Sequence, residues 1–190
     1  MKIETKIIRL SSGVLTLRAP EPEDAEEILK ATVKMAGETK FLSGTPETRN
    51  IPLEREMEWV DRKNESESEY IIAAYYKSTN YITRDVPEVY VGNLELRLNT
   101  GERQRHRAGV GIALLQKYTH LGIGSQMFRY AKEIAKKHNV EMLELDVIST
   151  NLPAINCYVK QGFEITGNKK KFLKYEDGTY GNMYHMQCEL

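Results

Sequence analysis

The sequence of 190 residues contains only two cysteines, Cys157 and Cys188, and no Cys-x-x-Cys pair. Two distant cysteines form no disulfide framework, and with four scattered histidines they indicate no metal site. Lys+Arg and Asp+Glu both number 27, so no excess charge favours nucleic acid or an anionic membrane as a partner. No apolar run approaches the length of a membrane span, and residues 1–5 lack a signal-peptide core. These absences predict a cytoplasmic protein without nucleic-acid or membrane partners.

The chain length predicts one domain, residues 1–190, with a single sizeable core, since no repeat or linker divides it. Residues 14–18 alternate apolar and polar side chains and predict the first strand. A helix over residues 52–63 would bury Leu53, Met57 and Val60 on one face. Two adjacent strands are predicted, with a turn-forming connection between them. Their ranges are 69–76 and 88–98, and the connection is 77–87.

A glycine turn between a strand and a helix is the central feature of the sequence. The apolar residues 108–115 are short enough for a buried strand, and Gly122 and Gly124 follow. The helix after the turn has one apolar face. That face consists of Met127, Phe128, Ala131, Ile134 and Ala135. Free backbone N–H groups at such a helix start, together with the positive end of the helix dipole, make a site for phosphate.

Two better-known phosphate motifs do not fit this turn. The dinucleotide fingerprint needs a third glycine where Met127 stands, and the P-loop needs a lysine between Gly124 and Ser125. Without further motifs, a helix that happens to open with two glycines would explain the pattern equally well.

A second motif supplies the missing specificity: Asn151, Ala154, Tyr158, Gly162 and Phe163 fit Asn-x-x-Ala-x-x-x-Tyr-x-x-x-Gly-Phe. Together with the glycine turn, this segment resembles the acetyl-CoA-binding core of the GNAT superfamily of N-acetyltransferases. The first motif of that family is Gln/Arg-x-x-Gly-x-Gly/Ala, in which Thr119 replaces the usual Gln or Arg here. The resemblance covers most of the chain and is strongest from residue 109 to residue 163.

The resemblance implies an α/β fold with a mixed, mostly antiparallel central sheet, a splayed parallel strand pair and helices on both faces, the acyl-CoA N-acyltransferase fold. It also implies acetyl-CoA as co-substrate, with no metal. Asn151 and Gly162 have structural explanations as well, as a helix N-cap and as the residue just past a helix end. The cofactor-binding residues implied by the motifs are Leu114, Leu115, Gln116, Thr119, His120, Leu121, Gly122, Ile123, Gly124, Ser125 and Asn151.

The expected reaction moves an acetyl group to a primary amine acceptor by direct attack in a ternary complex. The acceptor would be an amino acid, a polyamine, another small amine or a protein N-terminus. Backbone N–H groups around residues 114–116 would polarise the thioester carbonyl. Tyr158 is the expected general acid, because a phenol stays protonated at neutral pH and can protonate the leaving thiolate. The alternative hypothesis is a non-catalytic acyl-CoA-binding module of the same fold.

The general base stays open at the level of sequence. Gly109 stands where many relatives carry a glutamate, which leaves Glu95, His106, Asp146 or a water chain. The arginines of residues 100–107 would form either a basic mouth near the cofactor phosphates or a solvated turn. The closing strand, residues 180–190, could pair with a second subunit in a homodimer.

Overall fold

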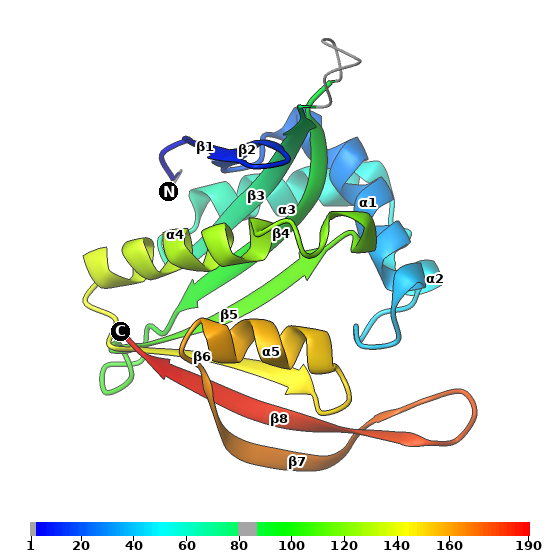
Figure 1. Cartoon of the computed structure of the whole chain (residues 1–190), viewed down its shortest axis with the longest axis vertical. Helices are drawn as coiled ribbons and strands as arrows, with labels where there is room; N and C mark the ends of the chain where they lie inside the picture. The colour runs from blue at the N-terminus through cyan, green and yellow to red at the C-terminus, as the bar shows by residue number, and fades with distance from the viewer. Residues whose placement is uncertain (1–2, 80–86) are drawn as a thin grey trace.

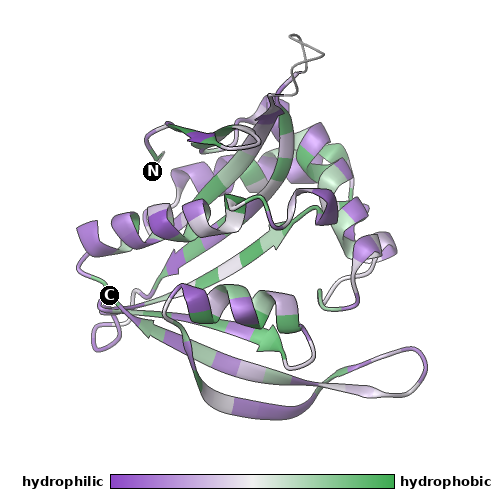
Figure 2. Ribbon diagram, viewed as in Figure 1, coloured by the Kyte–Doolittle hydropathy of each residue, from purple (hydrophilic) through white to green (hydrophobic). Residues whose placement is uncertain are grey.

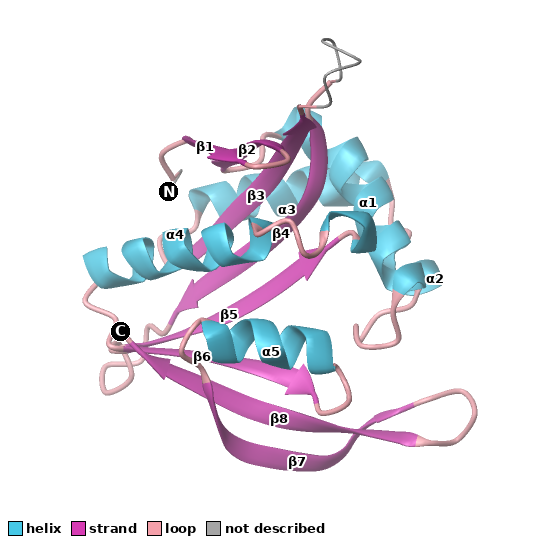
Figure 3. Cartoon of the chain, viewed as in Figure 1, coloured by secondary structure: helices cyan, strands magenta, loops and turns pink. Residues whose placement is uncertain are grey.

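The computed structural model describes residues 3–79 and 87–190, so most of the predicted 77–87 connection lies outside the described residues. The described strands form one open eight-stranded sheet in the order β1-β2-β3-β4-β5-β6-β8-β7 (Figure 1, Figure 3). The strands are β1 (Lys6–Leu10), β2 (Gly13–Arg18), β3 (Glu69–Ser78), β4 (Val89–Leu98), β5 (Arg107–Leu114), β6 (Met142–Ile148), β7 (Glu164–Lys174) and β8 (Tyr180–Glu189).

Helices cover both faces of this sheet, and each face has its own apolar cluster. Helices α4 (Ile123–Lys137) and α5 (Leu152–Lys160) lie in front in Figure 1. Helices α1 (Ala25–Glu38) and α3 (Leu53–Glu65) lie behind, and the short α2 (Pro46–Arg49) joins them. Single-turn 3-10 helices are η1 (Pro22–Asp24) and η2 (Gln116–Tyr118). None of the helices in the described ranges is long and apolar enough to cross a membrane.

The side-chain pattern of each strand reflects how many of its faces are covered. Strand β3 is an almost continuous apolar run because helices lie on both of its faces. Strand β6 alternates instead: Leu143, Leu145 and Val147 are buried in the cluster beneath α4 and α5. Glu144 and Asp146 therefore project from the opposite face of β6, which α1 and α3 leave open.

The parallel pair β5 and β6 separates soon after it begins. The two strands pair only from Arg107 with Met142 to Gly109 with Glu144. Strand β5 continues to Leu114 on its antiparallel partner β4, and β6 continues to Ile148 on its partner β8. The carboxyl halves of β5 and β6 thus face an open gap, and this splay confirms the fold class predicted from the sequence.

The first strand was not the one predicted, because β1 precedes β2 and pairs with it as an antiparallel hairpin. Residues 6–10 place two isoleucines side by side, so the alternating pattern that revealed β2 is interrupted there. Ile7 is 72% exposed on this edge strand, which a sequence pattern for a half-buried strand does not anticipate.

The buried face predicted for the helix over residues 52–63 was wrong at two of its three positions. Leu53 and Met57 on α3 are 37% and 39% exposed, and only Val60 is buried as expected. Glu56 and Lys63 are buried in their place. The buried Lys63 is paired with the sheet, since its Nζ lies 2.9 Å from Glu69 and 3.3 Å from Glu95, and Glu56 lies on the same face of the helix.

Candidate active site

A cavity of about 230 Å³ occupies the splay between β5 and β6. Its wall is mostly apolar and draws on five parts of the chain: the loop after α1, strands β5 and β6, helix α5 and the β7–β8 hairpin. The lining residues are Phe41, Leu42, Ser43, Val110, Gly111, Ile112, Leu145, Asp146, Ile148, Tyr158, Phe172, Leu173 and Met183. Such a cavity beyond the paired part of two parallel strands is a typical ligand site of an open α/β sheet.

Tyr158 is the predicted catalytic residue that lines this cavity. It comes from α5, is 8% exposed, and packs edge-on against Phe128, with Phe163 beside it. Burial raises the pKa of the Tyr158 hydroxyl far above its ordinary value. The side chain is therefore a proton donor, rather than an anion, throughout the neutral range.

The backbone donors expected at residues 114–116 differ in availability. The Leu115 N–H donates to the Val91 carbonyl of β4 at 2.9 Å, and the Gln116 N–H donates to Glu38 Oε2 at 2.7 Å. Successive N–H groups of a strand point to opposite edges, so the Leu114 N–H points away from β4 and into the splay. Of the three expected donors, Leu114 alone faces the gap with its N–H.

The glycine turn has the backbone form that the motif predicts. His120 and Gly122 are left-handed, with φ of 61° and 81°, and Gly122 is the N-cap of α4. The first N–H that bonds back within this helix is that of Gln126, which donates to the Gly122 carbonyl at 3.2 Å. Residues Ile123, Gly124 and Ser125 form the turn whose N–H groups lack intrahelical partners. These donors at the positive end of α4 fit a pyrophosphate.

Two other predicted cofactor contacts have local roles. The Thr119 hydroxyl donates to the Gln116 carbonyl at 2.8 Å, so it fastens η2 to the glycine turn. Asn151 Oδ1 accepts the Ala154 N–H at 3.3 Å and thereby caps α5, as its sequence position predicts. Both side chains therefore form local hydrogen bonds that stabilise their own turns.

Of the two alternatives for the arginines of residues 100–107, the structure supports the solvated turn. Arg103 and Arg105 lie in the exposed turn before β5, whereas the glycine turn follows the other end of that strand. An eight-residue strand spans about 26 Å, which separates the arginines from the glycine turn. Arg107, at the start of β5, pairs with Glu144 instead.

The same geometry separates the candidates for the general base. His106 lies in the exposed turn before β5 and does not line the cavity. Glu95 lies on β4, where its carboxylate pairs with Lys63 at 3.3 Å. Asp146 is the candidate that lines the cavity, with 35% of its side chain exposed.

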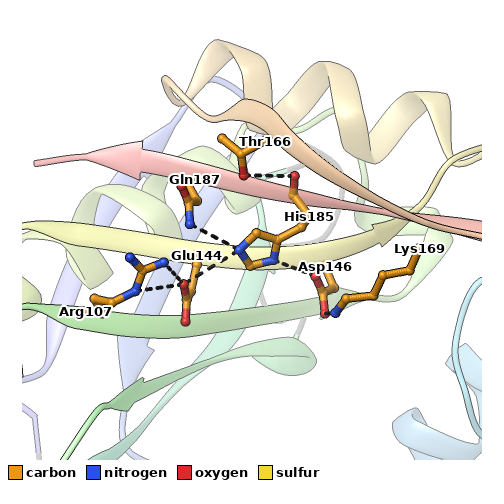
Figure 4. A network of polar contacts seen from close by, with 7 residues as sticks. All are labelled: Arg107, Glu144, Asp146, Thr166, Lys169, His185 and Gln187. Carbon is orange, nitrogen blue, oxygen red and sulfur yellow. Dashed lines mark hydrogen bonds and ion pairs between the residues drawn. The ribbon is translucent and has the colours of Figure 1, made fainter. Parts of the chain in front are cut away.

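Asp146 belongs to a polar network on the open face of β6, β8 and β7 (Figure 4). His185 Nδ1 lies 2.8 Å from one carboxylate oxygen, and Lys169 Nζ lies 2.8 Å from the other. Burial acts to raise the pKa of the Asp146 carboxyl, but the hydrogen bonds from Lys169 and His185 outweigh it, so the pKa is lowered. The site thus holds an ionised carboxylate at neutral pH.

Sequence reasoning missed His185, Lys169 and the apolar wall formed by Phe172 and Leu173. His185 stands opposite Asp146 in the ladder between β6 and β8, although 39 positions separate them in the chain. No local motif marks such a pair. Only the register of β8 on β6, read together with the exposed face of β6, could have revealed it.

Comparison with known proteins agrees with this geometry. Residues 41–163 match the family described as Acetyltransferase (GNAT) family. Over 97 residues, the chain is 34% identical to L-amino acid N-acetyltransferase AaaT of Escherichia coli (strain K12), which covers 50% of this chain and 59% of that protein. It is 31% identical over 88 residues to N-alpha-acetyltransferase 50 of Danio rerio, covering 46% and 52%. The chain therefore spans little more than half the length of either relative.

Solved structures show the same fold at lower identity. A GNAT acetyltransferase from Streptococcus pneumoniae superposes with a TM-score of 0.79 at 23% identity, covering 93% of this chain and 99% of that one. The acetyltransferase yncA from Salmonella typhimurium, solved with its cofactor acetyl-CoA, has a TM-score of 0.73 at 13% identity, covering 93% and 94%. Because the family match alone extends over well more than half of the sequence, this protein belongs to the GNAT family of acetyltransferases.

Proposed function

We propose that this protein transfers an acetyl group from acetyl-CoA to a primary amine, with residues 1–190 acting as one domain. The observation that carries the proposal is that Tyr158 and Asp146 line the same cavity in the splay. Tyr158 approaches from α5, on the face that α4 and α5 cover, whereas Asp146 projects from the opposite face of β6. A thioester placed between the strands would have a proton donor on one side and an amine-binding carboxylate on the other.

The cofactor side of the proposal uses main-chain groups. The N–H groups of Ile123, Gly124 and Ser125 would bind the pyrophosphate, and Gly122 lets it approach because no Cβ is present. The acyl arm would then enter the gap that β5 and β6 leave open. There the Leu114 N–H would donate to the thioester carbonyl as negative charge develops on its oxygen.

The chemistry on the acceptor side begins with a protonated amine, since an α-amino group has a pKa near ~8 and a lysine-type amine near ~10.4. Asp146 would bind the ammonium and pass one proton to solvent, which reaches its partly exposed side chain. The neutral amine then attacks, so an N–C bond forms while the C–S bond breaks. Tyr158 gives its proton to the departing thiolate, the new amide nitrogen releases its extra proton to water, and Tyr158 is reprotonated from that water.

The names of the relatives support a choice of amine acceptors. One is an L-amino acid N-acetyltransferase and another is an N-alpha-acetyltransferase, so both names concern α-amino groups. A solved neighbour is named a ribosomal L7/L12 alpha-N-protein acetyltransferase and contains coenzyme A. We therefore place α-amino groups of amino acids or polypeptides first in the acceptor panel, with polyamines and other small amines after them.

The test is CoA release from acetyl-CoA over that panel by the wild type and by Asp146→Asn and Tyr158→Phe. Each variant is expected to lower kcat/KM by about 100-fold, as removal of an acid or base typically does. Tyr70→Phe is the matched control: it removes a core tyrosine hydroxyl that bonds to His138, away from the cavity.

Binding of acetyl-CoA is measured in parallel by thermal shift. Ligand at ~100 times its dissociation constant should add roughly 2.7 kcal/mol to the free energy of unfolding. Binding without CoA release above the level of Tyr158→Phe would favour the non-catalytic acyl-CoA-binding module instead. Absence of both binding and turnover would refute the proposal.

A further inference from the structure

The β7–β8 hairpin forms one wall of the cavity and extends beyond the body of the protein (Figure 1). Phe172 and Leu173 of β7 face the cavity, and three exposed lysines flank them in the chain. We call Lys170, Lys171 and Lys174 the lysine arm. Figure 2 shows that β7 is mostly hydrophilic, in agreement with its exposed side chains.

An irregularity in the hairpin fixes the direction of the lysine arm. The register of β7 on β8 shifts between Lys169 and Leu173, and Lys171 has a left-handed φ of 52°. Its N–H donates to Asn182 Oδ1 at 2.9 Å, which supports a backbone conformation that non-glycine residues seldom adopt. Bulges of this kind beside a site re-aim side chains. Here the bulge lets Phe172 and Leu173 both line the cavity while the lysines remain exposed.

The charges of the lysine arm are available to a partner. Lys169, next to the arm, is already paired with Asp146 at 2.8 Å. Within residues 3–79 and 87–190, no carboxylate forms an ion pair with Lys170, Lys171 or Lys174. Lys171 and Lys174 instead lie 5.0 and 6.0 Å from the ring centre of Tyr180.

Four acidic residues belong to the same hairpin: Glu176 and Asp177 lie at its tip, and Glu164 and Glu189 lie at the opposite end. Glu176 and Asp177 belong to the turn, where Asp177 accepts the Thr179 hydroxyl at 2.6 Å. Next to the tip, Lys40 of the loop after α1 lies 5.3 Å from the Tyr175 ring centre. Strand β7 itself carries four lysines, Lys169, Lys170, Lys171 and Lys174, against one acidic residue, Glu164, so this strand is positively charged.

We infer that the acceptor is a polypeptide N-terminus followed by acidic residues, and that the lysine arm binds those carboxylates. This inference rests on the proposed function. The terminal ammonium would lie at Asp146 and the first side chain against the apolar wall. An extended chain advances about 3.4 Å per residue, so the next few residues reach the arm. A free amino acid carries its carboxylate beside the amine and cannot reach it, and a polyamine would be repelled.

The experiment compares two peptides that begin with the same leucine and continue with three glutamates or three glutamines. Wild type is compared with K170Q/K171Q/K174Q and with the control K34Q/K136Q/K137Q, which removes three exposed lysines from α1 and α4. We expect the wild type and the control to prefer the glutamate peptide by about ten-fold in kcat/KM at low salt, as three exposed ion pairs would give. This preference should fall in high salt, and in the arm variant it should fall to near one through KM.

The outcomes separate this inference from the proposed function. Peptide affinities are measured by fluorescence anisotropy with CoA present. They report the preference for the glutamate peptide over the glutamine peptide even without turnover. Acetylation of both peptides at equal rates, or an unchanged preference in the arm variant, overturns the inference and leaves the proposed function intact. An arm variant that raises the KM for acetyl-CoA instead, or that loses affinity for a single-stranded RNA, would assign the lysines to another ligand and also overturn it. Thermal melting of all variants confirms that they fold.

Discussion

His185 Nδ1 lies 2.8 Å from Asp146 Oδ1, across the ladder that joins β8 to β6. This contact fixes one oxygen of the Asp146 carboxylate beside the cavity, and Lys169 donates to the other oxygen. Glu144 of β6 lies 3.7 Å from the His185 Nε2 and itself pairs with Arg107 of β5 (Figure 4). The orientation of Asp146 therefore depends on side chains from β5, β7 and β8 as well as on its own strand.

Replacement of His185 should affect the reaction through Asp146. His185→Ala is expected to lower kcat/KM by about 10-fold, because a misplaced carboxylate holds the amine less well. The hydrogen bond from His185 lowers the pKa of Asp146, so its loss raises that pKa and moves the acidic limb of the pH profile to higher pH. His185→Asn keeps an N–H donor near the Nδ1 position and should restore most of both properties. Equal effects of the two substitutions would argue against a positioning role.

Ionisation of Tyr158 should not lower kcat on the alkaline side of its pH profile. Burial raises its pKa, so the hydroxyl remains protonated beyond the value near ~10 of an exposed tyrosine. The wild type should then keep its kcat as the pH rises from 7 toward about 10, apart from any effect of the acceptor. A loss of kcat with a pKa near 8 or 9 that disappears in Tyr158→Phe would contradict this assignment.

The two glycines of the turn should respond differently to alanine. Gly122 has φ of 81°, so Gly122→Ala should cost about 1 kcal/mol of stability and place a methyl group where the pyrophosphate approaches. A Cβ at Gly124 would lie 3.6 Å from Ile112 and 3.7 Å from Leu114, which is ordinary contact within a helix. Gly124→Ala should therefore melt no lower than the wild type. Acetyl-CoA titrations of both variants, with urea unfolding, test the difference.

Glu56 should make the protein less stable at neutral pH than it would be with glutamine. Burial raises the pKa of this carboxyl, with Arg49 opposing and Glu95 adding to the effect. Ionisation therefore costs more in the folded than in the unfolded state, and the penalty develops as the pH rises above the unfolded pKa of ~4.3. Glu56→Gln should unfold at higher urea concentration at pH 7. The gap should close below about pH 4, where the wild-type carboxyl is protonated in both states.

The parts of the site that depend on neighbours in sequence could be predicted. The turn at Gly122 needs a residue that tolerates a positive φ, and the cap at Asn151 needs a side-chain acceptor for a free N–H group. Glycine and asparagine at these positions predict both features directly. The same holds for the strand that ends at Leu114, because its apolar run stops where η2 begins.

The parts that depend on register could not be predicted. Asp146 was one of several base candidates until the splay placed it on the cavity and β8 placed His185 beside it. Both interpretations of the arginine-rich turn stayed open because it adjoins β5 in the chain, and adjacency does not say which end of a strand a site occupies. The buried Lys63 broke the apolar periodicity of α3 for the same reason, since Glu69 and Glu95 come from the sheet.

Glu38 Oε2 accepts the Gln116 N–H at 2.7 Å, which ties the last residue of α1 to the chain just beyond β5. The loop after α1 contributes Phe41 to the wall of the cavity, whereas the chain after β5 leads into the glycine turn. If the glycine turn binds the nucleotide as proposed, this hydrogen bond would connect the turn with the loop beside the cavity. We would then expect an ordered kinetic scheme in which acetyl-CoA binds before the amine.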